Sequence, residues 1–592
     1  MPVAAHRIDN ATLTWLALLL LAVGVYLFGL GGQYIPSNGD ELVYSHIARL
    51  TAASRQWLPL VSELDHMRNT KPPLLFWQAM VAGDWGRHWS LAALRAPSLF
   101  YTLLTTGAVA WSLWQITGNL RSACVAGCVY LAFFCTFRYG RTYLTSAPET
   151  FWLNLPVFCL LWHRLRPTAN LPDRDPGWLV HGGFGLTLGL GLAYKSFILI
   201  APAAATLWCA QLLSAPGVNW RRAMRVSLKV ALSAAIALAI FAMWFVLDPD
   251  PGAIWNEFVI GENASKLSSE NGYWQVAVFG GGTSIWAQLM AYVQNAGLLA
   301  FVELGLIGLG IRVALARRRP GAAALPVHMI ILLIWLAVWL IVFTLPSQRS
   351  ARYLIPAMPA LAMLTALCWQ RVGRAWFLLS LLVCGVLIVG LGRIAWAAHE
   401  IGIGSGIELG ASLLAMVAGL LLVIVGAVRP TSTRACTVAA CFAVYACFGL
   451  STAPLNGDSG QYAREVSGQL HQARIAVPNG FNGQFERFEF LLPGNRFIPY
   501  DSEERAALNA STIELSRLLA SHDAVIWLQS NPSERTPPCA PSCLVLGSRW
   551  EIKGRHQAGE IHLGNLWQPQ RWLFRREWLL TRPLPPDVGA RR

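Results

Sequence analysis

The chain has 592 residues, of which 55% are hydrophobic and 13% are charged, and its formal net charge is +15 at pH 7. A soluble protein this apolar would expose large hydrophobic patches, so the composition excludes an ordinary soluble domain and favours a membrane protein. The positive charge does not require a nucleic-acid partner, and we expect none, because membrane proteins collect Arg and Lys in cytoplasmic loops.

The first apolar run covers 12–32 and follows His6 and Arg7. It has the roughly 20 residues that cross a bilayer. It is too long for the core of a signal peptide, and no small-residue cleavage site follows it. We therefore expect a retained first membrane helix with a cytoplasmic N-terminus.

Apolar runs of this kind recur along the chain and predict about thirteen transmembrane helices. They lie at about 12–32, 92–116, 122–138, 145–164, 177–194, 196–214, 226–247, 294–315, 326–346, 353–369, 376–395, 408–428 and 435–453. An odd number of spans places the C-terminal tail on the side opposite the N-terminus.

Short basic loops follow the even-numbered runs and mark the cytoplasmic side by the positive-inside rule. Their cations are Arg121, Arg164, Arg166, Arg174, Arg221, Arg222, Arg225, Arg317, Arg318, Arg319, Arg371, Arg374, Arg429 and Arg434. The loops after the odd-numbered runs have fewer clustered cations. The N-terminus is therefore expected in the cytoplasm and the tail outside it.

Three outer segments are long, and the last forms a domain of its own in this prediction. Loops at about 33–91 and 248–293 belong to a membrane domain over 1–453, whereas 454–592 is expected to be a small α/β domain. The tail has strand-like runs at Arg474–Val477, Phe488–Leu492, Ala524–Leu528 and Cys543–Leu546, and a helix-like stretch at Glu503–Leu519.

Cys539 and Cys543 stand apart from the other cysteines, most of which lie in apolar runs. Outside the cytoplasm a local disulfide between them is slightly favoured over two free thiols. No zinc-type pair of CxxC motifs occurs, and we expect no metal ligands of that kind.

Asp40 and Glu41 form an acidic pair shortly after the first run, in an outer segment that carries Lys71 and Tyr44 as well. Neighbouring carboxylates at a membrane surface are costly unless something uses them. One could act as a general base, or both could hold a divalent cation. The simpler alternative is that Asp40 only caps a helix that starts at Glu41.

Cations on the expected outer side are contrary to the usual enrichment of positive charge in cytoplasmic loops. An anionic ligand would explain their presence there. Two guanidinium groups at Arg349 and Arg352, beside Tyr353, could clamp a phosphate, and Lys71 could add a point charge. The alternative is that these side chains only anchor the chain at the interface. Further candidates on this side are Arg95, Arg141, Glu149, Lys195, Glu262, Asn263 and Lys266. Asn263-Ala264-Ser265 also matches the pattern of a glycosylation acceptor.

These motifs resemble the GT-C glycosyltransferases that use polyprenyl-phosphate sugars, in particular the group that includes the lipid A aminoarabinose transferases (ArnT) and the protein O-mannosyltransferases. The matching pieces are Asp40-Glu41 with Tyr44, Trp57-Leu58-Pro59, Lys71 to Trp77, Arg95 to Ser98 and Arg352 to Pro356. The resemblance covers roughly residues 10–370.

The resemblance implies an all-α polytopic membrane protein of GT-C type, in the bacterial inner membrane, with its small α/β domain in the periplasm. It implies inverting transfer of a sugar from a polyprenyl-phosphate donor to an envelope acceptor. That acceptor could be a lipid A-like glycolipid, another glycan or a protein. Asp40 would be the main catalytic carboxylate with Glu41 in support, and Lys71, Arg349, Arg352 and Tyr353 would bind the donor phosphate.

Four positions differ from the usual pattern of ArnT-like chains. Val43 stands where Arg is common, Ala147 precedes Pro148 where an Asp does, Asn263 follows Glu262 where His is common, and Lys266 stands where Arg is common. The sequence leaves open whether Glu149 replaces the missing acid.

Two other classes of function remain as alternatives at this level. A transporter or flippase of lipid-linked saccharides would need repeated halves around a site at the bilayer midplane, and the sequence has no such repeat. In a non-catalytic envelope scaffold, the tail would bind a partner and Asp40 would have no role. Neither the sugar nor the acceptor follows from the sequence.

Overall fold

The structure, a computed structural model, describes residues 9–36, 39–165, 175–214, 217, 219–266, 272–318, 324–479, 483–501, 511–529, 536–554, 556 and 558–583. Of the predicted cytoplasmic cations, Arg166, Arg174 and Arg319 lie outside these residues. So does 503–510, the start of the predicted tail helix.

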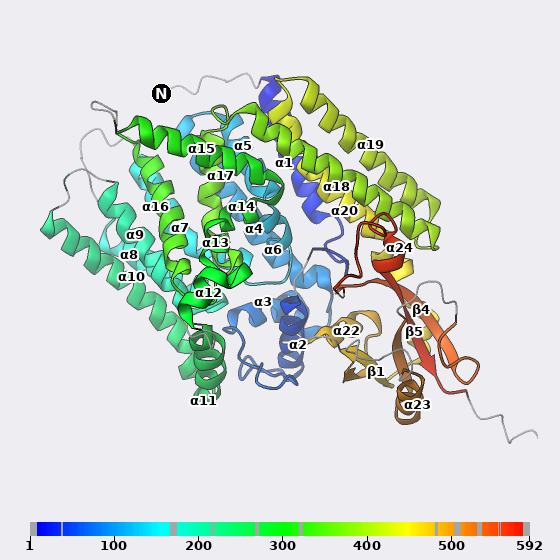
Figure 1. Cartoon of the computed structure of the whole chain (residues 1–592). Helices are drawn as coiled ribbons and strands as arrows, with labels where there is room; N and C mark the ends of the chain where they lie inside the picture. The colour runs from blue at the N-terminus through cyan, green and yellow to red at the C-terminus, as the bar shows by residue number, and fades with distance from the viewer. Residues whose placement is uncertain are drawn as a thin grey trace, which may run out of the picture.

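A bundle of long helices makes up most of the molecule, with the tail at its lower right in Figure 1. Each predicted span coincides with a helix, because only a helix satisfies its own backbone in lipid. The helices are α1 (Asn10–Leu27), α4 (Leu91–Thr117), α5 (Leu120–Ala132), α7 (Ser146–Leu165), α8 (Trp178–Tyr194), α9 (Ile200–Leu213), α10 (Trp220–Leu247), α15 (Ala300–Ala316), α16 (Val327–Thr344), α17 (Met358–Leu367), α18 (Arg374–Glu400), α19 (Gly406–Val428) and α20 (Thr433–Asn456).

Within the described residues, seven helical stretches are long and apolar enough to cross a membrane. They are α1, α10, α16, α18, α19, α20 and the stretch Ala291–Ala316, which contains α15. The prediction of a polytopic, all-α membrane part is therefore confirmed. The count of about thirteen spans stays a prediction.

Several predicted spans are broken near one end. The run 122–138 divides at Phe133, whose extended backbone separates α5 from α6 (Phe134–Tyr139). The run 353–369 begins as the 3-10 helix η7 (Ala351–Ala357), and 196–214 begins as η2 (Phe197–Leu199). Non-helical backbone is tolerated in membrane proteins where it is buried in protein or lines a cavity, and two of these breaks carry residues of the site below.

Short helices cover the lower end of the bundle in Figure 1. They come from the two predicted outer loops and include α2 (Asp40–Ala53), α3 (Leu74–Ala82), α11 (Pro251–Ala253), the π-helix η3 (Ile254–Asn263), η4 (Ala264–Lys266), α12 (Tyr273–Phe279) and α13 (Ile285–Leu289). The tail lies at this same end of the molecule.

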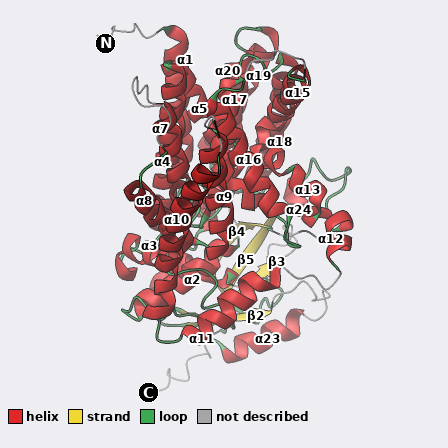
Figure 2. Ribbon diagram, turned by 90° about the vertical axis from the view of Figure 1, so that its left-hand side faces the viewer, coloured by secondary structure: helices red, strands yellow, loops and turns green. Residues whose placement is uncertain are grey.

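The tail is built on a five-stranded sheet in the order β2-β1-β3-β5-β4, which confirms the predicted α/β type. The strands are β1 (Arg474–Asn479), β2 (Arg496–Asp501), β3 (Ala524–Gln529), β4 (Leu544–Ile552) and β5 (Phe574–Thr581). β1 pairs in parallel with β2 and β3, and β5 pairs antiparallel with β3 and β4. Figure 2 shows the sheet below the bundle, with α11 and α23 (Ser511–Ser521) beneath it.

One predicted strand is wrong. The run Phe488–Leu492 lies mostly in the short helix α22 (Arg487–Leu491), in which Phe488 and Leu491 are buried at a spacing of three. Short apolar runs do not distinguish a strand from a helix by period alone. The sequence also missed β5 and β2. Pro499 argues against a strand in β2 but is tolerated because β2 is an edge strand.

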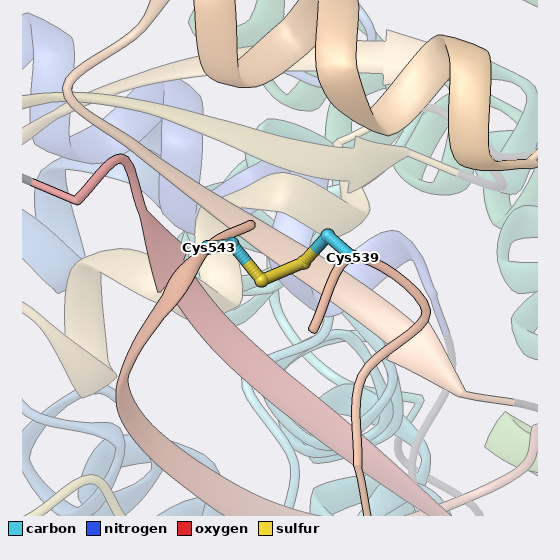
Figure 3. The surroundings of a disulfide bond; sticks show 2 residues. All are labelled: Cys539 and Cys543. Atoms are coloured by element: carbon cyan, nitrogen blue, oxygen red, sulfur yellow. A yellow bond between two sulfur atoms is a disulfide. The ribbon is translucent and has the colours of Figure 1, made fainter. Parts of the chain in front are cut away.

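The predicted pairing of Cys539 with Cys543 is present in the tail, with an S–S distance of 2.00 Å. Figure 3 shows it closing the loop that leads into β4. The ten other cysteines are free thiols, and most are buried. The disulfide agrees with a tail in an oxidising compartment.

Candidate functional site

Asp40 is the first residue of α2, and its carboxylate faces a cation from far along the chain. Arg352 in η7 donates from Nη1 to Oδ2 of Asp40 at 2.7 Å. The N-cap of α2 is Gly39, so Asp40 does not occupy the capping position that the simpler alternative gave it. The side chain of Asp40 is 36% exposed. It is therefore both ion-paired and reachable.

Glu41, the other acid of the pair, points into the protein. It is buried, and its two oxygens accept from Nε and Nη2 of Arg95 at 2.7 and 2.9 Å. The backbone N–H of Tyr143 also donates to it at 2.8 Å. Arg95 in turn donates to the carbonyls of Leu30 and Gly32 at 2.8 and 2.6 Å. This bidentate pair ties α2, α4 and the segment after α1 together.

Lys71 forms the second ion pair of the site, with Glu262 of the π-helix η3. Its Nζ also donates to the carbonyl of Thr70 at 2.7 Å and lies 5.8 Å from the centre of the Tyr44 ring. Tyr44 is buried on α2 and packs edge-on against Phe76. The Tyr44 ring therefore lies next to the Lys71 amine and connects it to α2, the helix that carries Asp40.

Lys195 forms the third pair. It ends α8, and its Nζ donates to Oε1 of Glu149, on the first turn of α7, at 2.7 Å. Burial lowers the pKa of Lys195, and Glu149 opposes that shift. Arg352 and Lys71 lower the pKa of Lys195 further by repulsion, so both lie within electrostatic reach of its amine.

Lys71 and Glu262 of the second pair and Lys195 of the third line one cavity of about 640 Å³, its open mouth included. Tyr353, next to Arg352 in sequence, also lines it, and Lys195 lies 5.7 Å from the centre of the Tyr353 ring. The lining residues are Lys71, Lys195, Ser196, Ile198, Leu199, Phe258, Glu262, Asn263, Phe343, Pro346, Gln348 and Tyr353. Polar and apolar groups thus share the wall, as they do in sites for amphipathic ligands.

Two predicted cations do not reach this cavity. Arg349 is buried and donates to the carbonyls of Thr344 and Thr283 at 2.8 and 3.2 Å. Arg141 donates to the carbonyls of Val25 and Phe28 at 3.3 and 2.9 Å, where it satisfies the C-terminal end of α1. The predicted Arg349–Arg352 clamp is therefore not formed in the structure. Arg95 is likewise turned to Glu41 and lines no part of the cavity.

Asn263 lines the cavity, but its amide is already used. Ser196 donates to Oδ1 at 2.8 Å, and Nδ2 donates to the carbonyl of Phe258 at 2.7 Å. The side chain is buried, which leaves no exposed amide for glycosylation. Lys266 ends η4, and its side chain lies outside the described part of the structure.

The sequence prediction missed two residues that shape the site. Tyr139, at the end of α6, lies with its ring centre 5.2 Å from the Arg352 guanidinium. Ser196 orients the Asn263 amide from the break between α8 and η2. Tyr139 follows Arg138 and Ser196 follows Lys195, and both cations lie at the outer end of a predicted span. That position was the only signal that could have found them.

The residues that the structure describes contain no group of three or more His, Cys, Asp or Glu side chains placed to hold a metal ion. The carboxylates of the site are instead paired one by one with cations.

Comparisons with known proteins find similar sequences and a similar fold. The family described as dolichyl-phosphate-mannose-protein mannosyltransferase matches residues 40–255, which begin at Asp40. An undecaprenyl phosphate-alpha-4-amino-4-deoxy-L-arabinose arabinosyl transferase from Sodalis glossinidius is 25% identical over 575 residues, covering 93% of this chain and 96% of its own. The transferase of the same name from Aeromonas salmonicida is 25% identical over 60% of this chain and 59% of its own.

Among solved structures, ArnT from Cupriavidus metallidurans bound to undecaprenyl phosphate has a TM-score of 0.56 at 16% identity. The alignment covers 95% of this chain and 98% of that one. Its apo state gives a TM-score of 0.57. The two proteins therefore share a fold over almost their whole length, tail included.

The predicted resemblance to ArnT and the protein mannosyltransferases is confirmed, and with it the class of the protein. The chain is a multi-span membrane glycosyltransferase with the GT-C fold.

Proposed function

We propose that this chain moves a sugar from a polyprenyl-phosphate carrier to an acceptor of the cell envelope, with inversion at the anomeric carbon. The observation that carries the proposal is a set of three cation–carboxylate pairs. Lys71, Glu262 and Lys195 line one amphipathic cavity, and Arg352 precedes Tyr353 of the same wall. Lys71, Lys195 and Arg352 come from distant parts of the chain, so their convergence is a property of the fold.

The three cations suit the phosphate of the donor. Each is paired with a carboxylate and remains 12–19% exposed, so a phosphate can replace the carboxylate as its partner. Phe258, Phe343 and Leu199 offer an apolar wall for the first units of the prenyl chain. Undecaprenyl phosphate, which the related ArnT structure holds, is the carrier we propose first.

Asp40 is the group we assign to catalysis. The bond between the anomeric carbon and the phosphate oxygen breaks, and a bond to the acceptor oxygen forms on the opposite face. Asp40 takes the proton of an acceptor hydroxyl, and polyprenyl phosphate leaves with the electron pair. Arg352 and the two lysines stabilise the charge that develops on the phosphate. An acceptor that attacks through a phosphate oxygen would depend less on a general base than an acceptor hydroxyl does.

For Glu41 we propose a positioning role in place of a catalytic one. Its carboxylate is buried and fully engaged with Arg95 and the Tyr143 N–H, so it cannot reach a substrate without leaving those partners. Breaking such a buried pair costs about 3–5 kcal/mol. Glu41 and Arg95 fix the start of α2, which presents Asp40.

The topology completes the proposal. We place the site on the extracytoplasmic face of the inner membrane, with the N-terminus in the cytoplasm and the domain 454–592 in the periplasm. The basic loops that alternate along the chain support this orientation. The tail disulfide supports it as well.

The test is transfer by the purified protein in lipid nanodiscs, with undecaprenyl-phosphate aminoarabinose as donor and lipid A as the first acceptor. The variant Asp40→Asn should lower turnover at least about 100-fold, the range expected for a general base. The control is Asp84→Asn, because Asp84 lies in the same outer segment and is 48% exposed. Near wild-type turnover by D40N would contradict the catalytic assignment.

A further inference from the structure

The helix that presents Asp40 is held from two sides. Glu41, Tyr44, Ile47 and Ala48 are buried against the membrane bundle. Val43, His46 and Arg49 follow one another at a spacing of three, which places them on one face of α2. That face contacts the tail, and in Figure 1 α2 lies beside α22.

Glu486 of the tail is the centre of this contact. Its carboxylate lies 2.9 Å from Nδ1 of His46, and both side chains are fully buried. Arg49 donates to the same carboxylate through Nε at 2.7 Å and Nη2 at 2.9 Å. The N–H of Glu63 donates to Nε2 of His46 at 3.2 Å, which assigns the ring proton to Nδ1. Glu486 therefore holds two side chains of α2 at once.

The shape of the contact is as specific as its charge. Gly483 has a φ of +75°, and a Cβ there would lie 2.9 Å from Cγ2 of Val43 and 3.2 Å from its Cα. Only glycine allows the tail backbone to approach α2 this closely. Val43 lies about one helical turn after Asp40. The tail thus rests on the first turn of the helix.

We infer that Glu486 is a positioning residue for the transfer reaction, acting through His46 and Arg49 to fix α2 and thereby Asp40. His46 and Arg49 lie about two turns along a single 14-residue helix from Asp40. Arg352 is the ion-pair partner of Asp40 at the other end. A helix held at both ends keeps its first carboxylate in place, and a misplacement of about 1 Å can cost about 100-fold in rate.

This inference rests on the proposed function only in taking Asp40 as the catalytic carboxylate. It gives the tail a role within the enzyme, as the part that completes the active-site helix. Loss of a contact that only joined two domains would lower the stability of the protein. It would leave the kcat and KM of the enzyme that remains folded unchanged.

The experiment uses the full chain in nanodiscs with two independent variants. Glu486→Gln removes the charge and keeps the shape, and Gly483→Ala keeps the charge and alters the shape. Glu514→Gln is the matched control, because Glu514 is an exposed acid on α23 of the same tail. Thermal unfolding and hydrogen exchange in β1 and β3 establish that each variant is folded.

For both test variants we expect kcat to fall about tenfold or more, with the KM for the polyprenyl-phosphate donor within about twofold. Lys71 and Lys195, which bind the phosphate in our proposal, do not lie on α2. Hydrogen exchange should rise in α2 (residues 40–53) and stay unchanged in α8. The control should match the wild type in both measurements.

The inference is overturned if folded E486Q keeps the wild-type kcat and the wild-type exchange of α2. It is also overturned if kcat falls while α2 exchange stays unchanged. The exchange measurement needs no turnover, so it separates two failures. If the wild type shows no transfer activity but E486Q loosens α2, the proposed function fails and the coupling of tail to helix stands.

Discussion

Two clusters of paired charges in this protein look alike in composition and differ in exposure. The tail cluster joins Arg487, Arg549 and Arg575 to Glu551 and Glu577, and the last two carboxylates and Arg549 are fully buried. Two carboxylates of the candidate site are more open, with Asp40 36% and Glu262 31% exposed. A closed cluster can only stabilise the fold, whereas an open pair can exchange one partner for an anionic ligand.

The physical reason lies in desolvation. Charges that are withdrawn from water are stable only while every partner stays, so removal of one strands the others. Charges at the wall of a cavity keep part of their hydration and can rearrange at lower cost. The same residue types therefore stabilise the sheet in the tail and, in our proposal, bind phosphate at the candidate site. The four predictions below test this difference.

The largest effect is expected from Arg549→Ala in the closed cluster. Arg549 is paired with Glu577 and also donates to the carbonyl of Gly460 at 3.1 Å. Its loss removes one of the two arginines that pair with the buried Glu577 carboxylate, so the free energy of unfolding should fall by about 3–5 kcal/mol. Denaturant unfolding measures this, with exposed Arg571→Ala as the control. An unchanged midpoint would show that the cluster is not a structural element.

Arg352→Ala should give the next largest effect, on activity. Loss of one donor to developing negative charge lowers kcat about 100-fold. The matched variant is Arg349→Ala, because the sequence paired these two arginines and the structure separates them. R349A should lower stability while the folded fraction keeps most of its kcat. Equal loss of kcat in both would restore the clamp that the sequence predicted.

Lys71→Ala should raise the donor KM about tenfold, because one charge-assisted contact to phosphate contributes roughly 1.5–3 kcal/mol before competition. Glu262→Gln should act in the opposite direction. It removes the carboxylate that competes with phosphate for Lys71. Steady-state kinetics with varied donor distinguishes the two. A rise in donor KM for both variants would mean that the pair is structural.

The smallest effect is a displaced pH profile. Burial lowers the pKa of Lys195 from the ordinary 10.5, and Arg352 and Lys71 lower it further against Glu149. Phosphate binding needs the charged amine, so donor affinity should decline as the pH rises through this lowered pKa. Lys195→Arg keeps its charge and should move the decline to higher pH. An identical alkaline limb in wild type and K195R would exclude Lys195 as the titrating group.

The sequence predicted the regular parts of this protein well, because they depend on local properties. Apolar length located the helices, and alternation with turn residues found β1, β3 and β4. It failed at Phe488–Leu492, where a short apolar run has no decisive period, and at β2, whose proline is acceptable only at an edge that pairing creates.

For the site, the sequence by itself determined the residue types and their order: an acid after the first span, Lys71 in the same loop and Arg352 before a later one. Only the tertiary structure decided which charge meets which. It paired Asp40 with Arg352, turned Glu41 and Arg349 inward, and paired Lys195 of the cavity wall with Glu149. Which charged side chains form ion pairs at the site depends on burial and on contacts between residues up to 312 positions apart. Neither can be inferred from the local sequence.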